Sequence, residues 1–202
     1  MIGFSQAIKE RHSQGLDAKG MDYLNRVVQE SGHMNLMIAG LLQLSRLSTL
    51  PMNIRTLDLS AIAQGKAESL RKKYQRSIRF LIQGGIHVNG DEHLMDILIG
   101  ELMDNSCKFT STRDDPTISF GLREGEGGPS VFIQDNGVGF DPVYSDRLFT
   151  PFQRLHSENE FPGIGMGLAI ASLIVRRHGG IIRGESMVDS GATFLFTIPP
   201  IV

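Results

Sequence analysis

The sequence predicts an α+β protein, with helices at the N-terminus and a second domain that combines helices with a mostly antiparallel sheet. First, apolar residues recur every three or four positions between residues 19 and 47, which is typical of a long amphipathic helix. Second, Leu50 and Pro51 interrupt this pattern. Third, short alternating stretches and glycine-rich turns follow among further helical stretches, which favours strands that pair with their neighbours.

Two helices are expected before Pro51. Residues Ile2–His12 look like the end of one helix, with Gly15 as its stop. The second helix runs from about Lys19 to Leu47 and carries an apolar stripe that the short first helix covers only in part. We therefore expect residues 1–52 to form a dimerising helical hairpin, with two copies in a four-helix bundle. The alternative is that the stripe packs on the second domain of its own chain.

The second domain is expected to span residues 53–202 and to form a two-layer α/β sandwich, because its helices would cover one face of a mixed, mostly antiparallel sheet. Asp58 and Asp91 are suited to cap its first two helices. The expected helices cover about residues 58–75, 91–108 and 166–178. The expected strands cover about residues 78–82, 86–89, 117–123, 130–135, 181–187 and 192–198. A glycine turn would connect the first two strands, and the long irregular segment 136–162 needs a functional explanation.

Composition argues against several classes of protein. The chain has 202 residues, of which 41% are hydrophobic and 21% charged, as is usual for a globular protein. A net charge of -2 gives no general attraction to nucleic acid, and no window is apolar enough to span a bilayer. The first residues do not resemble a signal peptide, and the single cysteine, Cys107, fits a reducing compartment and a place in the core. We therefore expect a cytoplasmic segment without nucleic-acid or membrane contacts.

Three separated segments carry groups suited to one nucleotide site. Asn105 and Lys108 lie about one helical turn apart, so they share a helix face and can reach a metal and a phosphate chain. In the second segment, Asp135 precedes two glycines that would let the backbone approach a flat ring. The third segment, Gly-Ile-Gly-Met-Gly at residues 163–167, runs into a helix whose first amide groups face anions. Together these segments predict a site for ATP and Mg²⁺.

The order of these motifs is similar to that of a known family. Glu-x-x-x-Asn-x-x-Lys, Asp-x-Gly-x-Gly-Phe, Phe-Thr-Pro-Phe, Gly-x-Gly-x-Gly-Leu and a final Gly-Ala-Thr-Phe resemble the ATP-binding domain of sensor histidine kinases, in the gyrase, chaperone, histidine kinase and MutL (GHKL) superfamily. The similarity runs from about Leu57 to the end of the chain. Upstream, the helix ending in Leu41-Leu42-Gln-Leu44 resembles that family's dimerisation and phosphotransfer hairpin. Phe152-Gln-Arg-Leu-His156 with a short lid is similar to the phytochrome-like and sensory-box branch.

The resemblance implies a role for each matched residue. Asn105 would bind Mg²⁺ with Glu101 beside it, and Lys108 would contact the phosphates. Asp135 would accept a hydrogen bond from the amino group of adenine, a donor that guanine replaces with a carbonyl. The other nucleotide contacts implied are Gly137, Gly139 and Thr193 near the base, Gly163, Gly165, Gly167 and Leu168 near the triphosphate, and Phe149, Phe152 and Arg154 in the lid.

The sequence departs from the family at the phosphoacceptor, a His followed by an acidic residue. Here His12 precedes Ser13, and His33 precedes Met34. We expect the acceptor to lie upstream of Met1 in a longer protein, so that this chain binds ATP but cannot phosphorylate itself. The alternative is that His12 or His33 is the acceptor. In the parent protein the phosphoryl group would pass from ATP to a His, and then to an Asp of a response regulator receiver domain.

A second departure leaves two other functions open. Glu101 occupies a position where many of these kinases carry Asn, whereas related ATPases keep a Glu there as a general base for water. One alternative to the kinase is therefore a GHKL-fold ATPase that uses Glu101 as its general base. The other is a non-catalytic scaffold that binds a nucleotide and dimerises. Six basic residues between residues 66 and 79 are expected to form a solvated helix face, with a docking patch for the receiver domain as the alternative.

Overall fold

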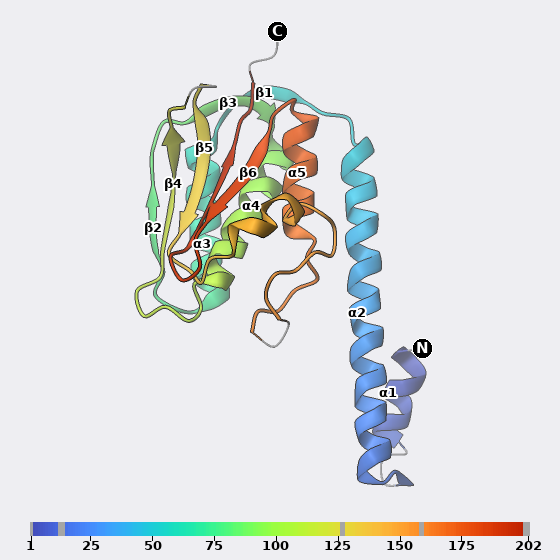
Figure 1. Cartoon of the computed structure of the whole chain (residues 1–202). Helices are drawn as coiled ribbons and strands as arrows, with labels where there is room; N and C mark the ends of the chain where they lie inside the picture. Colours follow the sequence, from blue (N-terminus) through green and yellow to red (C-terminus); the bar gives the residue numbers. More distant parts are fainter. Residues whose placement is uncertain (1, 12–14, 126–127, 158–159, 200–202) are drawn as a thin grey trace. The chain divides into compact units, whose positions relative to one another are not determined.

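The computed structural model describes residues 2–11, 15–125, 128–157 and 160–199 (Figure 1). Its internal contacts divide the chain into two compact units, Met1–Ser45 and Arg46–Val202. His12, one of the two candidate acceptors, lies outside the described residues.

The first unit contains helix α1 (Ile2–Arg11) and most of helix α2 (Ala18–Thr49). Both predicted helices are therefore present, and α2 extends two residues beyond its predicted end at Leu47. Many large apolar side chains of α2 are exposed in the single chain, namely Val27, Met34, Leu36, Met37, Ile38, Leu41 and Leu42. Among the described residues, no helix combines the length and the apolarity that crossing a membrane requires.

The second unit is built on a five-stranded sheet with the strand order β2-β4-β5-β7-β6 (Figure 1). Its strands are β2 (Arg79–Ile82), β4 (Thr117–Arg123), β5 (Ser130–Asp135), β6 (Ile182–Ser186) and β7 (Ala192–Phe196). Only the β2–β4 pair is parallel within this described sheet, which confirms the prediction of a mixed, mostly antiparallel arrangement. A separate two-stranded antiparallel sheet pairs β1 (Ile54–Asp58) with β3 (His87–Asp91).

Three helices cover one face of the five-stranded sheet and form the second layer (Figure 1). They are α3 (Leu59–Tyr74), α4 (Glu92–Phe109) and α5 (Gly167–Arg177), and a short 3₁₀ helix, η2 (Pro142–Arg147), lies in the long irregular segment. The carboxylate of Asp58 accepts a hydrogen bond from Ala61 N (3.1 Å), and that of Asp91 accepts one from Leu94 N (3.0 Å). Both predicted helix caps are therefore confirmed, as is the α+β fold class.

Helix α4 supplies the centre of the core. Its fully buried side chains are Leu94, Met95, Leu98, Ile99, Leu102 and Met103, and those of the sheet include Ile118, Phe120, Ile133 and Phe196. Burying each large apolar side chain stabilises the fold by about 1.5–3 kcal/mol. Because these apolar residues fix which side of α4 faces the sheet, they also fix the direction in which its polar residues point.

The structure corrects the sequence-based prediction at two strands. Strand β1 was not expected, because Leu57 is its one buried side chain and its alternation is too weak to recognise. The turn at residues 83–85 does not connect neighbouring strands, since β2 and β3 lie in different sheets. The hydroxyl of Ser60 donates to Gln83 O (2.7 Å) and accepts from Ile86 N (3.0 Å), so the start of α3 holds the two strands apart.

Candidate functional site

Helix α4 presents three polar side chains, Glu101, Asn105 and Lys108, at successive spacings of four and three residues. This spacing places them on one face of the helix, where all three are partly buried. Within the described part of the chain, none of the three makes a hydrogen bond or an ion pair, although Lys108 Nζ lies 4.5 Å from the centre of the Phe109 ring. A carboxylate, an amide and an ammonium group are therefore available together for a ligand.

The predicted glycine segment lies against this face of α4. A methyl group added at Gly167 would lie 2.6 Å from Glu101 Oε2 and 3.3 Å from Asn105 Nδ2, and one added at Gly163 would lie 3.4 Å from Lys108 Nζ. Gly167 is also the first residue of α5, and no side chain caps that helix end. Because the first amide groups of a helix lack partners within the helix, this end of α5 can bind an anion. The structure thus brings the first and third predicted segments together.

Asp135 lies at the end of β5 and is buried, with 5% of its surface exposed. Its Oδ1 accepts hydrogen bonds from Gly137 N (2.9 Å) and Ala192 N (3.4 Å), which leaves Oδ2 available to a further donor. Burial raises the pKa of the Asp135 carboxyl above its ordinary value, although these amide donors and the nearby Ser106 hydroxyl act in the opposite direction.

Ser106 Oγ is buried beside Asp135, and it has no hydrogen-bond partner of normal geometry among the described residues. Leaving a buried hydroxyl without a partner costs about 1–3 kcal/mol, so native proteins rarely keep one without a ligand or an ordered water. Ser106 and Asp135 together offer a hydroxyl and a carboxylate oxygen to a planar group that can both donate and accept. An adenine ring fits this description. Ser106 was not predicted as a site residue. Its position directly after Asn105 on α4, on the buried side of the helix, is the signal that could have identified it.

The two glycines after Asp135 are required by close contacts within the protein. A methyl group at Gly137 would lie 2.6 Å from Phe109 O, and one at Gly139 would lie 2.9 Å from Ser186 Oγ. Gly139 also has a φ of 65°, in the left-handed region that favours glycine. These glycines therefore keep the turn after Asp135 close to the end of α4, whether or not they also border a ring.

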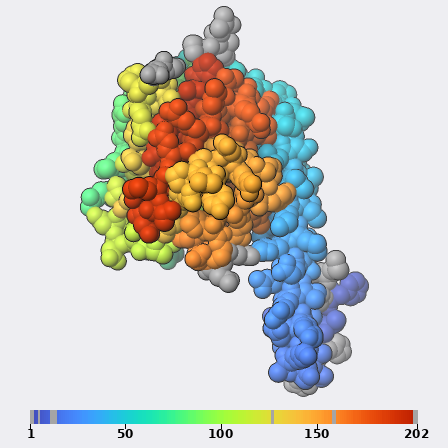
Figure 2. Space-filling model, in the orientation of Figure 1, coloured from blue at the N-terminus to red at the C-terminus, as the bar shows by residue number. Residues whose placement is uncertain are grey.

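The irregular segment folds against the C-terminal end of α4. The rings of Phe109, His156 and Phe161 form a cluster with centroids 5.0 to 5.5 Å apart. His156 Nε2 donates to Gly139 O (2.9 Å), and Arg154 Nη2 donates to Phe161 O (2.7 Å). Figure 2 shows the neighbouring η2 segment, which packs against strand β6.

Phe149, Phe152 and Leu168, three further predicted site residues, are partly buried. Phe152 has a φ of 65°, which is unusual for a residue with a side chain, and its amide donates to Gly165 O (3.0 Å). A methyl group at Gly165 would lie 2.6 Å from Gln153 O. The predicted lid and the predicted glycine segment therefore hold each other in place at this point.

The structure does not bring the Thr193 side chain to the Asp135 carboxylate. Thr193 is paired with Gln134 on β5 and with Glu185 on β6, so the three side chains share one face of the sheet. Asp135 follows Gln134 and points to the other face, where the neighbouring residue of β7 is Ala192. Strand alternation thus places Ala192, and not the Thr193 side chain, beside the Asp135 carboxylate. The expectation that Thr193 lies near the base stays a prediction.

The charges around α4 suit proton transfer and phosphate binding. Burial raises the pKa of the Glu101 carboxyl, and Asp104 adds to this shift, while Lys73 opposes it. Burial also lowers the pKa of the Lys108 ammonium. A carboxyl group with a raised pKa is a better proton acceptor at neutral pH than an ordinary glutamate. By contrast, burial raises the pKa of the Cys107 thiol to about 12, so Cys107 is an inert core residue.

Most of the basic run between residues 66 and 79 makes contacts within the domain. Three of its residues form ion pairs: Lys66 with Asp96 (2.6 Å), Lys73 with Asp104, and Arg79 with Asp115 (3.3 Å). Arg71 lies over the ring of Phe80. Arg76 donates to the Cys107 and Thr110 carbonyls at the end of α4. These residues hold α3, α4 and β2 together. They give no support to the alternative of a docking patch.

The described residues contain no group of three or more His, Cys, Asp and Glu side chains that could hold a metal ion. Mg²⁺ in nucleotide sites is usually held by phosphate oxygens, waters and only one or two protein groups. The side-chain oxygens of Asn105 and Glu101 are hard donors of the type that Mg²⁺ prefers. The residues present therefore fit a magnesium ion that arrives with a nucleotide.

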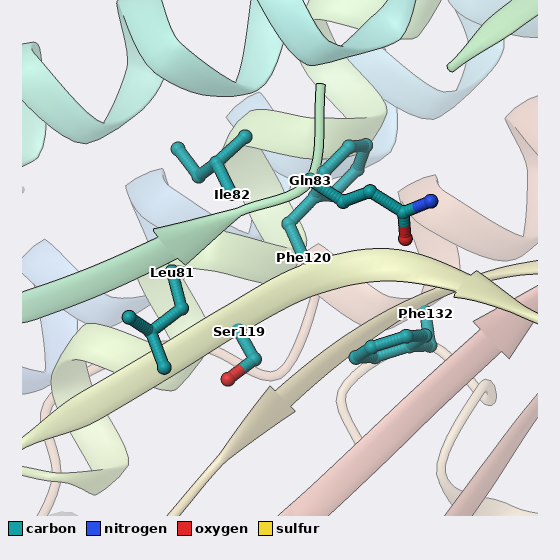
Figure 3. Close-up of a pocket in the computed structure, with 6 residues that line it drawn as sticks. All are labelled: Leu81, Ile82, Gln83, Ser119, Phe120 and Phe132. Atoms are coloured by element: carbon teal, nitrogen blue, oxygen red, sulfur yellow. The ribbon is translucent and has the colours of Figure 1, made fainter. Parts of the chain in front are cut away.

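A hollow of about 410 Å³ lies elsewhere on the domain, at strands β2, β4 and β5 (Figure 3). Its lining residues are Leu81, Ile82, Gln83, Ser119, Phe120 and Phe132. None of these lining residues is charged, and none is a predicted site residue. We therefore do not assign the nucleotide to this hollow.

Known proteins are similar to this chain in sequence and in fold. The family model for the histidine kinase-, DNA gyrase B-, and HSP90-like ATPase matches residues 90–201. Cyanobacterial phytochrome A of Nostoc sp. is 32% identical over 201 residues, which cover 98% of this chain and 26% of the phytochrome. The chain thus spans about a quarter of the length of this relative.

Two solved structures have the same fold. The mycobacterial sensor histidine kinase MprB matches with a TM-score of 0.61 and 22% identity over 74% of this chain and 100% of its own. Full-length ShkA in complex with AMPPNP matches with a TM-score of 0.64 and 21% identity over 96% of this chain and 41% of its own.

The fold is the one that the mycobacterial sensor histidine kinase MprB has. The chain belongs to the histidine kinase-, DNA gyrase B- and HSP90-like ATPase family, because the family model matches more than half of its length. Its relatives include phytochromes, and the predicted resemblance to sensor histidine kinases of the phytochrome-like type is confirmed.

Proposed function

We propose that this chain is the catalytic core of a two-component sensor histidine kinase, which binds Mg²⁺-ATP and directs its γ-phosphoryl group to a His of the parent protein. One observation is the main support: Glu101, Asn105 and Lys108 share one face of α4 without hydrogen-bond or ion-pair partners among the described residues, and the glycine segment lies against them, with Gly167 next to Glu101 and Asn105. Membership of the family supports it.

In this proposal each segment binds one part of the nucleotide. Asp135 accepts a hydrogen bond from the amino group of adenine, and Ser106 binds the same edge of the ring. Lys108 and the amide groups at the start of α5 neutralise the phosphates. Asn105, with Glu101 beside it, is a ligand of Mg²⁺, which supplies charge neutralisation when it is bound. Phosphoryl transfer needs mainly positioning and charge stabilisation, and these residues provide both.

The proposal includes a phosphoacceptor outside the described part of this chain. His33 lies within α2 but is followed by Met34, whereas the acceptor motif of the resemblance has an acidic residue there. The aligned phytochrome is about four times as long as the matched segment, so a parent protein has room for an acceptor and a sensor. The final acceptor is an Asp of a response regulator. An ATP-dependent kinase of this kind acts in the cytoplasm.

Dimerisation through the N-terminal helices is a further part of the proposal. Seven large apolar side chains of α2 between Val27 and Leu42 are exposed in the single chain. An exposed apolar stripe of this length is typical of a surface that another protein covers. A second copy of the hairpin, residues 1–52, covers it in a four-helix bundle, and the catalytic domain comprises residues 53–202.

Hydrolysis of ATP is the second candidate function, and the raised pKa of Glu101 favours it. In this alternative the Glu101 carboxylate takes a proton from the attacking water. The phosphate then leaves into solution, and no phosphohistidine forms.

The test begins with calorimetric titration of Mg²⁺-ATP into the wild-type chain, the variant Asp135→Asn and the control Asp146→Asn, an exposed aspartate of η2. We expect Asp135→Asn to weaken ATP binding about 10- to 100-fold, the equivalent of a hydrogen bond to a charged group, and the control to leave it unchanged. Equal affinities in all three proteins would refute the assignment of Asp135.

A second step separates the two functions. A separately prepared helical hairpin that carries a histidine followed by an acidic residue is added with labelled ATP, and acid-labile phosphate on the hairpin is measured. Labelled hairpin supports the kinase. Steady release of phosphate without labelled hairpin supports the ATPase. Binding of ATP with neither result leaves a nucleotide-binding scaffold.

A further inference from the structure

Arg113 connects two turns that are distant in sequence. It follows the C-terminal end of α4, and its guanidinium group is partly buried. Its Nε donates to Asn136 O (2.9 Å), and its Nη2 donates to Gly137 O (2.9 Å) and to Asp189 O (2.8 Å). Nothing in the motif analysis identified this residue.

These contacts hold the turn that directly follows Asp135. The amide of Gly137 donates to Asp135 Oδ1, while the carbonyl of the same residue accepts from Arg113. Gly137 therefore orients the Asp135 carboxylate through its amide, and Arg113 binds the carbonyl of the same residue. Since a guanidinium is planar and has a fixed fork of donors, it restricts the direction of the carbonyls that it binds.

The same turn is attached to its surroundings at Val138. Val138 N donates to Phe109 O (3.1 Å), and Val138 O accepts from Asp189 N (2.7 Å). Asp189 has a φ of 62°, an uncommon conformation for a residue with a side chain, in the turn between β6 and β7. Arg113 binds the carbonyl of this residue as well, so it joins the end of α4, the turn after Asp135 and the β6–β7 turn.

A simple surface ion pair does not account for this arrangement. The nearest carboxylate oxygen, Asp189 Oδ1, is 3.9 Å away, and that side chain is 81% exposed. Exposed ion pairs of this length contribute little, whereas three hydrogen bonds from a charged donor to main-chain carbonyls fix the position of the backbone. None of these contacts involves Lys108, Gly163 or Gly167, which we assign to the phosphates.

We propose that Arg113 is a positioning residue for recognition of the base: through the Asn136 and Gly137 carbonyls it holds the Asp135 carboxylate where it accepts a hydrogen bond from the amino group of adenine. This inference rests on the proposed function. It predicts that Arg113 affects the selection of ATP over GTP and does not affect the binding of phosphate groups.

The experiment measures dissociation constants of Mg²⁺-ATP, Mg²⁺-GTP and Mg²⁺-tripolyphosphate for the wild-type chain, Arg113→Ala and Arg113→Lys. Arg123→Ala is the matched control, because Arg123, the last residue of β4, is an arginine that pairs with Glu185 (2.9 Å) and makes none of these contacts with the turn. We expect Arg113→Ala to weaken ATP binding about 10-fold or more, with GTP and tripolyphosphate unchanged. Arg113→Lys recovers only part of the loss, because an ammonium group lacks the fork of donors.

The outcomes separate this inference from the proposed function. If Arg113→Ala leaves all three affinities unchanged, or weakens all three by the same factor, Arg113 has no role in base recognition and the inference is overturned. If the wild-type chain does not prefer ATP over GTP, or if Asp135→Asn does not alter that preference, the proposed function fails and this inference fails with it. Where Arg113→Ala does not fold, the ratio of the ATP and GTP constants of Arg113→Lys decides the question by the same criteria.

Discussion

His178 gives a prediction about stability and pH. Its Nδ1 donates to Ile174 O (2.8 Å), and its Nε2 accepts a hydrogen bond from Asp91 N (3.1 Å). One neutral tautomer of the imidazole, with the proton on Nδ1, satisfies both contacts. Asp91 caps α4, the helix that carries the candidate site, so this imidazole ties the end of α5 to the start of α4. Protonation of Nε2 would turn the acceptor into a donor that faces the Asp91 amide.

The direction of the effect follows from the pKa of His178. Burial lowers this pKa below the ordinary value, although the Ile174 contact and the charge of Asp91 oppose the shift and Arg177 adds to it. Between the folded and the unfolded pKa, the unfolded chain binds more protons, so stability rises with pH in that interval. The contribution of His178 is complete above the unfolded pKa of about 6.5 and is lost as the pH falls below it. The limiting slope for one proton is about 1.4 kcal/mol per pH unit.

Urea denaturation of the wild-type chain and of His178→Gln between pH 5 and pH 8 tests this reasoning. Glutamine retains a donor and an acceptor but does not titrate. We expect the free energy of unfolding of the wild-type chain to fall as the pH decreases from 7 to 5, by no more than the limiting slope for this one proton, and the variant to lose this part of the dependence. His87→Gln is the control, since the His87 side chain is exposed on β3 and its imidazole bonds to the nearby Gly85 O, away from α4 and α5. Equal pH dependence in the wild-type chain and in His178→Gln would refute the argument.

Two further predictions concern the candidate site. Gly167→Ala places a methyl group 2.6 Å from Glu101 Oε2, so we expect calorimetry to show that ATP binding is weakened about tenfold. The control is Gly65→Ala, whose added methyl group has nothing within 4 Å and leaves ATP binding unchanged. If the chain hydrolyses ATP, Glu101→Gln lowers the steady-state rate about 100-fold or more with little change in affinity, and the wild-type rate increases as the pH rises through the raised pKa of Glu101. An unchanged rate in Glu101→Gln would exclude Glu101 as the base.

Local patterns were enough to predict the elements that form the core. The apolar spacing of α4 and its cap at Asp91 are both properties of a short window, and the structure has them as predicted. The antiparallel pair β4–β5 was predicted within the same bounds, because its strands alternate and a glycine-rich turn joins them. Strand β1 could not be predicted, because its pairing with β3 depends on partners 29 to 37 residues away in the sequence.

The candidate site shows the same limit. The spacing of Asn105 and Lys108 is local, and their shared face of α4 follows from the helix period alone. The choice between Ala192 and Thr193 beside Asp135 depends on the register of β5 and β7, and a shift of one residue reverses it. Arg113 was missed for a similar reason, since its acceptors lie 23, 24 and 76 residues away.

Helix α5 links these separate observations. At its N-terminus, Gly167 lies against Glu101 and Asn105, and at its C-terminus Arg177 donates to the Leu47 and Leu50 carbonyls at the end of α2. Its eleven residues span about 16 Å, and most of their apolar side chains are buried, so the helix moves as one rigid piece. In Gly167→Ala the added methyl group clashes with Glu101 at the first residue of α5. A packed, rigid α5 does not shift to relieve this clash, so the expected loss of ATP affinity depends on the rigidity of the helix as well as on the methyl group.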